Sequence, residues 1–187
     1  MSLLHVTDIC GGPGHEFVPA DALHRGKYVH AVTDLLDKGK TLLEPIYEPW
    51  KGFIDAWANA KRELGITVVA SEEAFEDERR GYCGKRDKWA TMKGRRGSGI
   101  VDLKCNGSCA GTVPPTTGLQ LAGYVGDAKL WRSAVALHPD GTYRWHDDRN
   151  NKVIFQAGDW REFCARLTVM QADIRRGWRE APAERED

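Results

Sequence analysis

A carboxylate and an ammonium group stand two residues apart in an apolar stretch of the chain, at Asp102 and Lys104 within residues 100–104. The stretch is typical of a β-strand, and side chains alternate between the two faces of a strand. Asp102 and Lys104 should therefore project from one face, while Val101 and Leu103 project from the other. Burying such a pair costs desolvation free energy unless the two groups have a partner. A divalent metal ion with a bound water would supply that partner, so this strand is a candidate hydrolytic site.

Two further segments on either side of this strand carry polar side chains suited to the same chemistry. Residues 84–87 read Gly-Lys-Arg-Asp and end in a second carboxylate, Asp87. Residues 120–124 read Gln-Leu-Ala-Gly-Tyr, and on a helix Gln120 and Tyr124 share one face because they are four residues apart. Carboxylates suit Mg²⁺, a hard cation that prefers oxygen ligands. The metal lowers the pKa of a bound water and offsets charge on a phosphoryl group, and a neighbouring lysine can orient that water.

In this order, Gly-x-x-Asp, a strand-borne Asp-x-Lys and a helical Gln-x-x-x-Tyr resemble the motifs of the PD-(D/E)XK nuclease superfamily. The resemblance is greatest to its RecB-like and phage-exonuclease-like branch and extends over residues 26–145. It implies an α/β fold with a three-layer restriction-endonuclease-like core, in the order αβββαβ around a mixed central sheet, preceded by extra N-terminal helices. It also implies a deoxyribonuclease that depends on Mg²⁺ or Mn²⁺.

The resemblance assigns roles to individual residues. Asp87 and Asp102 would hold the metal, assisted by the backbone carbonyl of Leu103. Lys104 would activate or position the water. Gln120 would contact metal-bound water or backbone beside the site. These five positions form the expected catalytic centre.

Three residues outside this set are further candidates by resemblance. In RecB-like nucleases a histidine on an N-terminal helix, shortly after a glycine, completes the metal sphere, and His30 follows Gly26 in that way. Phage relatives often have a glutamate ahead of Gly-x-x-Asp. Adjacent Glu72 and Glu73 would point to opposite faces of a strand, so only one of them can reach the site, and the pattern favours Glu72. Tyr124 would lie against the site, one turn after the glutamine.

Each motif also has a purely structural explanation. Asp87 could end a turn, and Asp102 with Lys104 could form a strand ion pair, although an exposed pair contributes only ~0–1 kcal/mol. His30 could be a packing or surface residue. The helix that carries Gln120 could simply be amphipathic. We favour the functional explanation because all the motifs occur together, in one order and with the strand in place.

The charge of the chain is balanced overall but uneven along the sequence. Its 187 residues include 27 basic and 27 acidic ones, so the formal net charge is zero and gives no overall attraction to nucleic acid. Basic residues nevertheless gather around the candidate site. We expect nucleic-acid contacts from a set that combines cations with one aromatic residue: Lys85, Arg86, Lys88, Trp89, Arg95 and Arg96. A solvated loop of mixed charge is the alternative.

No apolar run approaches the ~20 residues of a membrane span, and the N-terminus lacks the basic region of a signal peptide. The five cysteines are scattered, so we expect no disulfide framework. Some RecB-like relatives hold an iron–sulfur cluster on four cysteines, and only the Cys105 and Cys109 pair offers a weak match to that spacing. We expect a cytoplasmic protein, and the resemblance implies a phage or prophage gene in a bacterial host.

Apolar periodicity and turn residues predict the elements that must position these groups. Helices are expected over residues 22–37, 49–64 and 116–129, and a last helix is expected to be capped by Asp159. Strands are expected over residues 66–70, 81–92, 98–105, 131–137 and 142–146. Residues 1–180 are expected to form one domain that opens with an irregular arm over residues 1–21. Residues 181–187 are expected to be a disordered tail.

These observations together predict a metal-dependent deoxyribonuclease with DNA as its substrate, of the phage exonuclease type that serves recombination or repair. A phage recombination protein is a candidate partner. Three alternatives remain: a nucleic-acid-binding accessory protein with the same fold and little activity, a site-specific endonuclease and, more distantly, a metalloenzyme with a non-nucleic-acid substrate. The sequence leaves open the polarity of digestion, the preference for single or double strands or RNA, the oligomeric state, and whether His30 or Glu72 completes the metal site.

Overall fold

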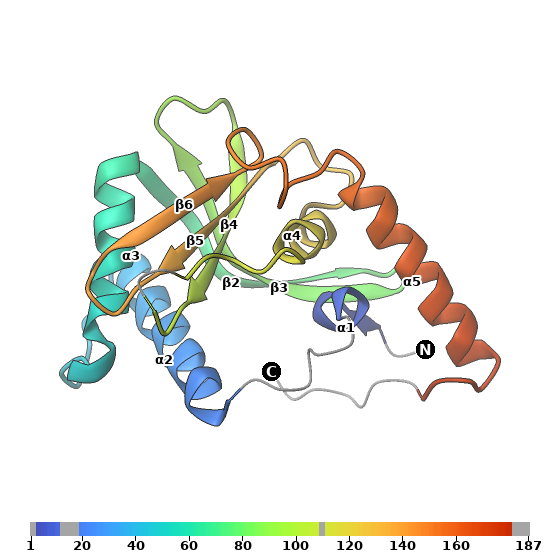
Figure 1. Cartoon of the computed structure of the whole chain (residues 1–187), viewed down its shortest axis with the longest axis horizontal. Coiled ribbons are helices and arrows are strands. Elements are labelled where there is room, and N and C mark those ends of the chain that lie inside the picture. Colours follow the sequence, from blue (N-terminus) through green and yellow to red (C-terminus); the bar gives the residue numbers. More distant parts are fainter. Residues whose placement is uncertain (1–2, 12–18, 109–110, 181–187) are drawn as a thin grey trace.

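A six-stranded mixed sheet forms the centre of the computed structural model, which describes residues 3–11, 19–108 and 111–180 (Figure 1). Its strands are β1 (Leu4–His5), β2 (Ile66–Asp77), β3 (Tyr82–Met92), β4 (Ser98–Cys105), β5 (Trp131–Leu137) and β6 (Tyr143–Asp147). The sheet has the order β1-β3-β4-β5-β6, and β2 pairs with the other edge of β3. The β1–β3 and β4–β5 pairs are parallel, whereas the remaining pairs are antiparallel.

Helices cover both faces of this sheet and make three layers. They are α1 (Val6–Cys10), α2 (Ala20–Asp37), α3 (Lys51–Leu64) after a short 3₁₀ turn η1 (Glu48–Trp50), α4 (Thr117–Val125) and α5 (Asp159–Arg175). One apolar core joins α2 and α3 to the face of β4 that carries Val101 and Leu103. A second core joins α1, α4 and α5 to the opposite face, where Ile100 lies. Among the described residues, no helix has both the length and the apolar character needed to cross a membrane.

The mixed α/β fold predicted from the sequence is confirmed, and four details differ; one is that α4, expected to reach residue 129, ends at Val125, where Gly126 follows with a φ of 60°. Residues 4–10, expected to be irregular, form β1 and α1 and bury Leu4, Val6 and Ile9. Strand β2 continues to Asp77, because an edge strand can expose polar residues to solvent. Asp159 is the first residue of α5 rather than its cap, and its carboxylate accepts a bond from the Gln156 N–H at 2.9 Å. Residues 12–18 and the expected tail at 181–187 lie outside the described residues.

Replacing Gly26 with alanine should stabilise the protein. Gly26 lies inside α2, and apart from the backbone of its own helix no described heavy atom stands within 4 Å of the position that a Cβ would take. Because alanine loses less backbone entropy than glycine on folding, Gly26→Ala should raise the free energy of unfolding by about 0.5–1 kcal/mol. Urea denaturation measures this change. A lower free energy of unfolding would mean that α2 packs more tightly at this point than the structure indicates.

Candidate active site

The site lies where strands β3 and β4 separate. On one edge of β3, β1 pairs with residues 82–83 and β4 pairs with residues 88–91, so residues 84–87 pair with no strand of the described chain on that edge. At the end of this gap the Asp87 carboxylate takes the place of a ladder partner. Its Oδ2 accepts a hydrogen bond from the Leu103 N–H at 2.8 Å. The Gly-x-x-Asp segment thus spans the gap, and its aspartate is fixed at the fork of the two strands.

Three potential metal ligands converge beside this fork. His30 comes from α2, Glu72 from β2 and Asp87 from β3. The Nδ1 atom of His30 lies 3.1 Å from Glu72 Oε1 and 3.5 Å from Asp87 Oδ1. One ligand atom from each of the three residues lies within 4.8 Å of the others, and all three are partly buried. The structure therefore brings together three residues that the sequence singled out, in an arrangement that could hold a cation.

Glu72 has an unusual backbone for a strand residue. Its φ of 54° is the one positive value for a non-glycine residue in the described part of the chain. A left-handed conformation costs an L-residue roughly 1–2 kcal/mol, and such strain occurs most often at functional sites. Here it accompanies a side chain that faces His30, whereas that of Glu73 pairs with Arg86 at 3.4 Å. Of the two glutamates, the one preferred from the sequence lies at the site.

A second group of side chains joins β4 to α4. The Nζ atom of Lys104 donates to Asp102 Oδ1 at 3.1 Å and to Gln120 Oε1 at 3.1 Å. The amide nitrogen of Gln120 donates in turn to the Tyr124 hydroxyl at 2.8 Å. Asp102 is 1% exposed, whereas the Lys104 side chain is 26% exposed. The strand alternation and the helical four-residue spacing inferred from the sequence thus produce one continuous chain of hydrogen bonds.

The electrostatics of the site favour an added cation. Burial alone would lower the pKa of His30, but Asp87 and Glu72 outweigh burial and raise it to about 9. His30 therefore carries a second proton at neutral pH when no metal is bound. Burial raises the pKa of Asp102 to about 6, Lys104 opposes that rise, and Asp87 adds to it. A divalent cation would replace the histidine proton and favour the ionised form of Asp102.

The residues present also fit a metal by their chemistry. Asp102 Oδ2 is buried and lies 2.9 Å from Lys104 Nζ, yet it has no partner with hydrogen-bond geometry among the described residues. Carboxylate oxygens with one imidazole suit Mg²⁺ or Mn²⁺. The Leu103 carbonyl, expected as a metal ligand, instead lies 3.2 Å from His30 Nε2. It can accept the Nε2 proton and so leave Nδ1 of His30 facing the carboxylates.

Two of the expected DNA-contacting cations are interior residues. The Lys88 side chain has no exposed surface and lies 2.9 Å from Asp37. The Arg95 side chain is 5% exposed and is held 2.6 Å from Asp147. Both belong to β3 or to the turn after it, where the sequence shows only a basic run. Because each is neutralised inside the protein, the expectation that Lys88 and Arg95 contact DNA is wrong for this structure.

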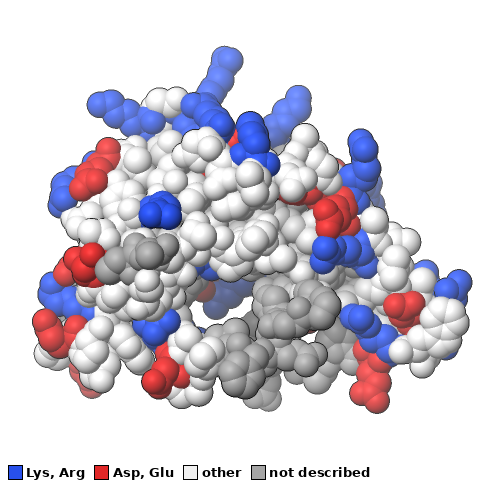
Figure 2. Space-filling model, viewed as in Figure 1, with Lys and Arg blue, Asp and Glu red and all other residues white. Residues whose placement is uncertain are grey.

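The other expected contact residues are distributed differently around the molecule. Arg86 donates to the Tyr124 carbonyl at 2.9 Å and lies over the rings of Phe75 and Trp89. Arg96 is exposed in the β3–β4 turn, at the end of β4 remote from Lys104. That turn lies along the upper edge of the face in Figure 2, where lysine and arginine side chains are most numerous. Lys85 remains as the half-exposed cation beside the ligand group, 3.2 Å from its glutamate.

Arg25 was not anticipated from the sequence. It lies on α2, and its Nη2 donates to the Cys105 carbonyl at 3.4 Å, at the end of the strand that carries Lys104. Its buried Nε atom has no hydrogen-bond partner among the described residues. A guanidinium near the site is a positive charge that can interact with a phosphate. Its place beside the site is evident only from the contact with the end of β4. An arginine early in a helix has no sequence pattern that would predict such a role.

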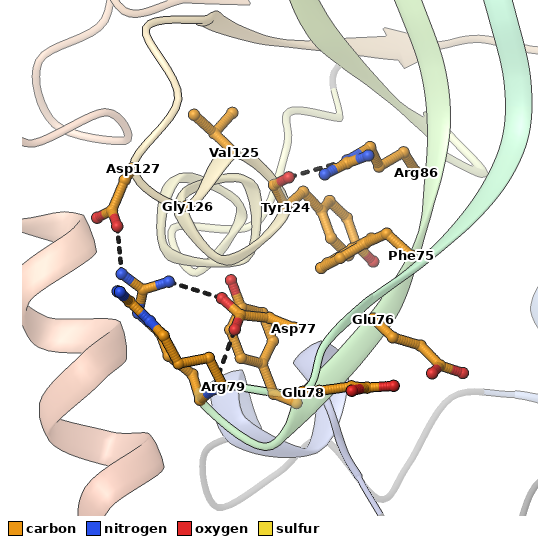
Figure 3. A pocket seen from close by; sticks show the side chains of 12 residues that line it. Phe75, Glu76, Asp77, Glu78, Arg79, Arg86, Tyr124, Val125, Gly126 and Asp127 are labelled. Carbon is orange, nitrogen blue, oxygen red and sulfur yellow. Dashed lines mark hydrogen bonds and ion pairs between the residues drawn. The ribbon is translucent and has the colours of Figure 1, made fainter.

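A separate pocket of about 530 Å³ lies between the β2–β3 turn and the end of α4 (Figure 3). Arg80 spans its wall, pairing with Asp77 at 2.7 Å and also with Asp127. Arg86 donates to the Tyr124 carbonyl at its rim. Arg80 and Arg86 are thus paired with groups on the pocket wall. We interpret the pocket as a result of these contacts, which hold the end of α4 against the sheet. The described ligand group lies elsewhere, around the histidine of α2.

The sequence matches no family model and no curated protein. Among solved structures, the chain is similar to an alkaline exonuclease, LHK-Exo from Laribacter hongkongensis. The TM-score is 0.47 with 15% identity, covering 94% of this chain and 89% of that one. It is also similar to a protein named SSO0001, with a TM-score of 0.41 and 15% identity, covering 90% of this chain and 75% of that one. Neither similarity is close enough to assign an activity.

Proposed function

We propose that this protein is a nuclease that uses a divalent metal, Mg²⁺ or Mn²⁺, to hydrolyse phosphodiester bonds in DNA. We further propose that it is a cytoplasmic exonuclease of the phage or prophage type, serving recombination or repair. The convergence of His30, Glu72 and Asp87 beside the buried Asp102–Lys104 pair carries the proposal. A fold that needed only an ion pair on β4 would have no reason to bring three more ionisable groups from three other elements to the same place.

In this proposal Nδ1 of His30 and carboxylate oxygens of Glu72 and Asp87 hold the metal, and Asp102, which lies outside that group of three and whose Oδ2 is 2.9 Å from Lys104 Nζ, is a further donor. The cation would lower the pKa of a water and neutralise charge on the scissile phosphate. The Leu103 carbonyl keeps the histidine in the required tautomer.

The remaining polar residues of the site act on the water and the phosphate. Lys104 is held in place by Asp102 and Gln120. Its ammonium is a compact positive charge that can donate to the water or to the phosphate. Tyr124 fixes Gln120 through a hydrogen bond at 2.8 Å. Arg25 on α2 provides additional positive charge for neighbouring phosphates.

Incubation with linear and circular DNA tests the proposal. With Mg²⁺ or Mn²⁺ the protein should degrade linear DNA, and EDTA should stop degradation. Asp87→Asn keeps an acceptor for the Leu103 N–H but removes the charge, so it should abolish cleavage and weaken Mn²⁺ binding in calorimetry. Asp21→Asn, on the exposed first turn of α2, is the matched control and should behave as wild type.

The products distinguish the alternatives. Degradation that spares circular DNA supports an exonuclease, and discrete fragments from circular DNA would indicate a site-specific endonuclease. DNA binding without cleavage in the presence of either metal would refute the enzymatic proposal and indicate an accessory protein.

A further inference from the structure

A buried ionic cluster lies on the α2–α3 side of the sheet. Lys88 of β3 lies 2.9 Å from Asp37 of α2 and donates to the Ser71 hydroxyl of β2 at 2.7 Å. The side chains of Asp37 and Lys88 have no exposed surface. Asp37 also accepts bonds from Trp57 Nε1 at 3.0 Å and from Lys61 Nζ at 2.5 Å. The carboxylate is therefore fully engaged by groups from two other elements, α3 and β3.

Three members of this cluster, Asp37, Lys88 and Ser71, each share an element with one candidate metal ligand. Lys88 directly follows Asp87, and Ser71 directly precedes Glu72. Asp37 comes seven residues after the histidine of α2, two helical turns along the same face. The elements that supply the three ligands are thus the same three that the cluster ties together.

Stability alone does not account for such a cluster. A buried ion pair is often no more stable than apolar side chains of similar volume, because desolvation offsets the attraction. The left-handed backbone of Glu72, in contrast, is unfavourable, so contacts of the residues before and after it are needed to maintain it. The Ser71–Lys88 bond fixes the residue before it, and the Glu73–Arg86 pair fixes the residue after it. The cluster therefore stabilises the backbone next to Glu72, the residue of the site with the least favourable conformation.

We propose that Asp37, Lys88 and Ser71 are positioning residues for the metal centre. They set the relative placement of α2, β2 and β3, so that the imidazole and two carboxylates meet with the spacing a cation requires. This inference rests on the proposed function. It assigns the basic residue Lys88, expected to contact DNA, to metal-site geometry instead.

Mn²⁺ affinity of the full chain tests this inference, measured by electron paramagnetic resonance at a temperature where each variant is folded. Lys88→Met should raise the dissociation constant by roughly 10- to 100-fold. Lys61→Met is the matched control, because it removes another cation from the same carboxylate. Lys61 comes from α3, which supplies no candidate ligand, so this variant should bind Mn²⁺ with near wild-type affinity.

A milder variant keeps the test decisive if Lys88→Met fails to fold. Ser71→Ala removes the bond to Lys88 and a hydroxyl contact with Asp34 of α2, and should weaken Mn²⁺ binding about fivefold. If Lys88→Met folds and binds Mn²⁺ with wild-type affinity, the positioning role is overturned. If Lys88→Met does not fold, wild-type affinity in Ser71→Ala overturns it instead. An equal loss of affinity in the Lys61→Met control would also overturn it. Failure of the wild-type protein to bind Mn²⁺ would refute the metal site itself, so the two failures are distinguishable.

Discussion

Lys104→Met should reduce metal-dependent DNA degradation by at least roughly 10³-fold, because it removes the charge that orients water or stabilises the phosphate. Methionine retains most of the side-chain length, and Lys104 is partly exposed, so the fold should persist. Loss of the ammonium also removes the group that opposes the raised pKa of Asp102, which should then protonate more readily. Initial rates on linear DNA, measured at saturating Mn²⁺, check the prediction.

Lys85→Met provides the comparison for that result. Lys85 also lies beside a site carboxylate, 3.2 Å from Glu72, but within the described part of the chain it forms no hydrogen bond or ion pair with Asp102 or Gln120, and it is half exposed. Its loss should weaken DNA binding in a salt-dependent way and leave the maximal rate largely unchanged. If the two variants cleave DNA at similar rates, Lys104 has no special role in the reaction.

Gly118→Ala should lower the free energy of unfolding by about 3 kcal/mol, because an added Cβ overpacks the core. That atom would lie 1.8 Å from the Ile154 carbonyl oxygen and 3.0 Å from Asp159 Oδ2. The backbone cannot rotate aside as a flexible side chain would, so α4 must shift. Gln120 lies two residues further along this helix, and activity should fall together with stability.

Urea denaturation measures the first effect, and cleavage assays on the folded fraction measure the second. Gly26→Ala makes the same chemical change inside another helix, with no neighbouring atom in the way, and should act in the opposite direction. Equal stability of Gly118→Ala and wild type would show that α4 and the loop at Ile154 are further apart than the structure places them.

Local sequence patterns predicted the parts of the site that depend on one element. Strand alternation placed Asp102 and Lys104 together, and their side chains hydrogen-bond at 3.1 Å. Helical spacing placed Gln120 next to Tyr124, and they also hydrogen-bond. These relations are fixed by backbone geometry alone, so they need no knowledge of the rest of the fold. The mixed α/β architecture followed in the same way from the order of the elements.

Relations between distant elements could not be predicted in this way. From the sequence, Lys88 is one of several basic residues expected at the surface. In the structure it is buried, because α2 places Asp37 next to it. The left-handed backbone of Glu72 is equally hidden, because non-glycine residues rarely adopt it and no residue type indicates it. The elements β1 and α1 span two and five residues, which is too short for a periodic pattern to emerge. The functional roles of the site residues remain proposals.

The fork between β3 and β4 has a mechanical consequence. Among the described residues, the β3–β4 ladder ends at Lys88, and beyond it the Asp87 carboxylate bonds the Leu103 amide. A change in the gap between Asp87 and Asp102 therefore strains one side-chain bond rather than a row of main-chain bonds. Between β3 and β4, this end of the sheet is therefore held by fewer described bonds than the half over residues 88–91 and 98–101.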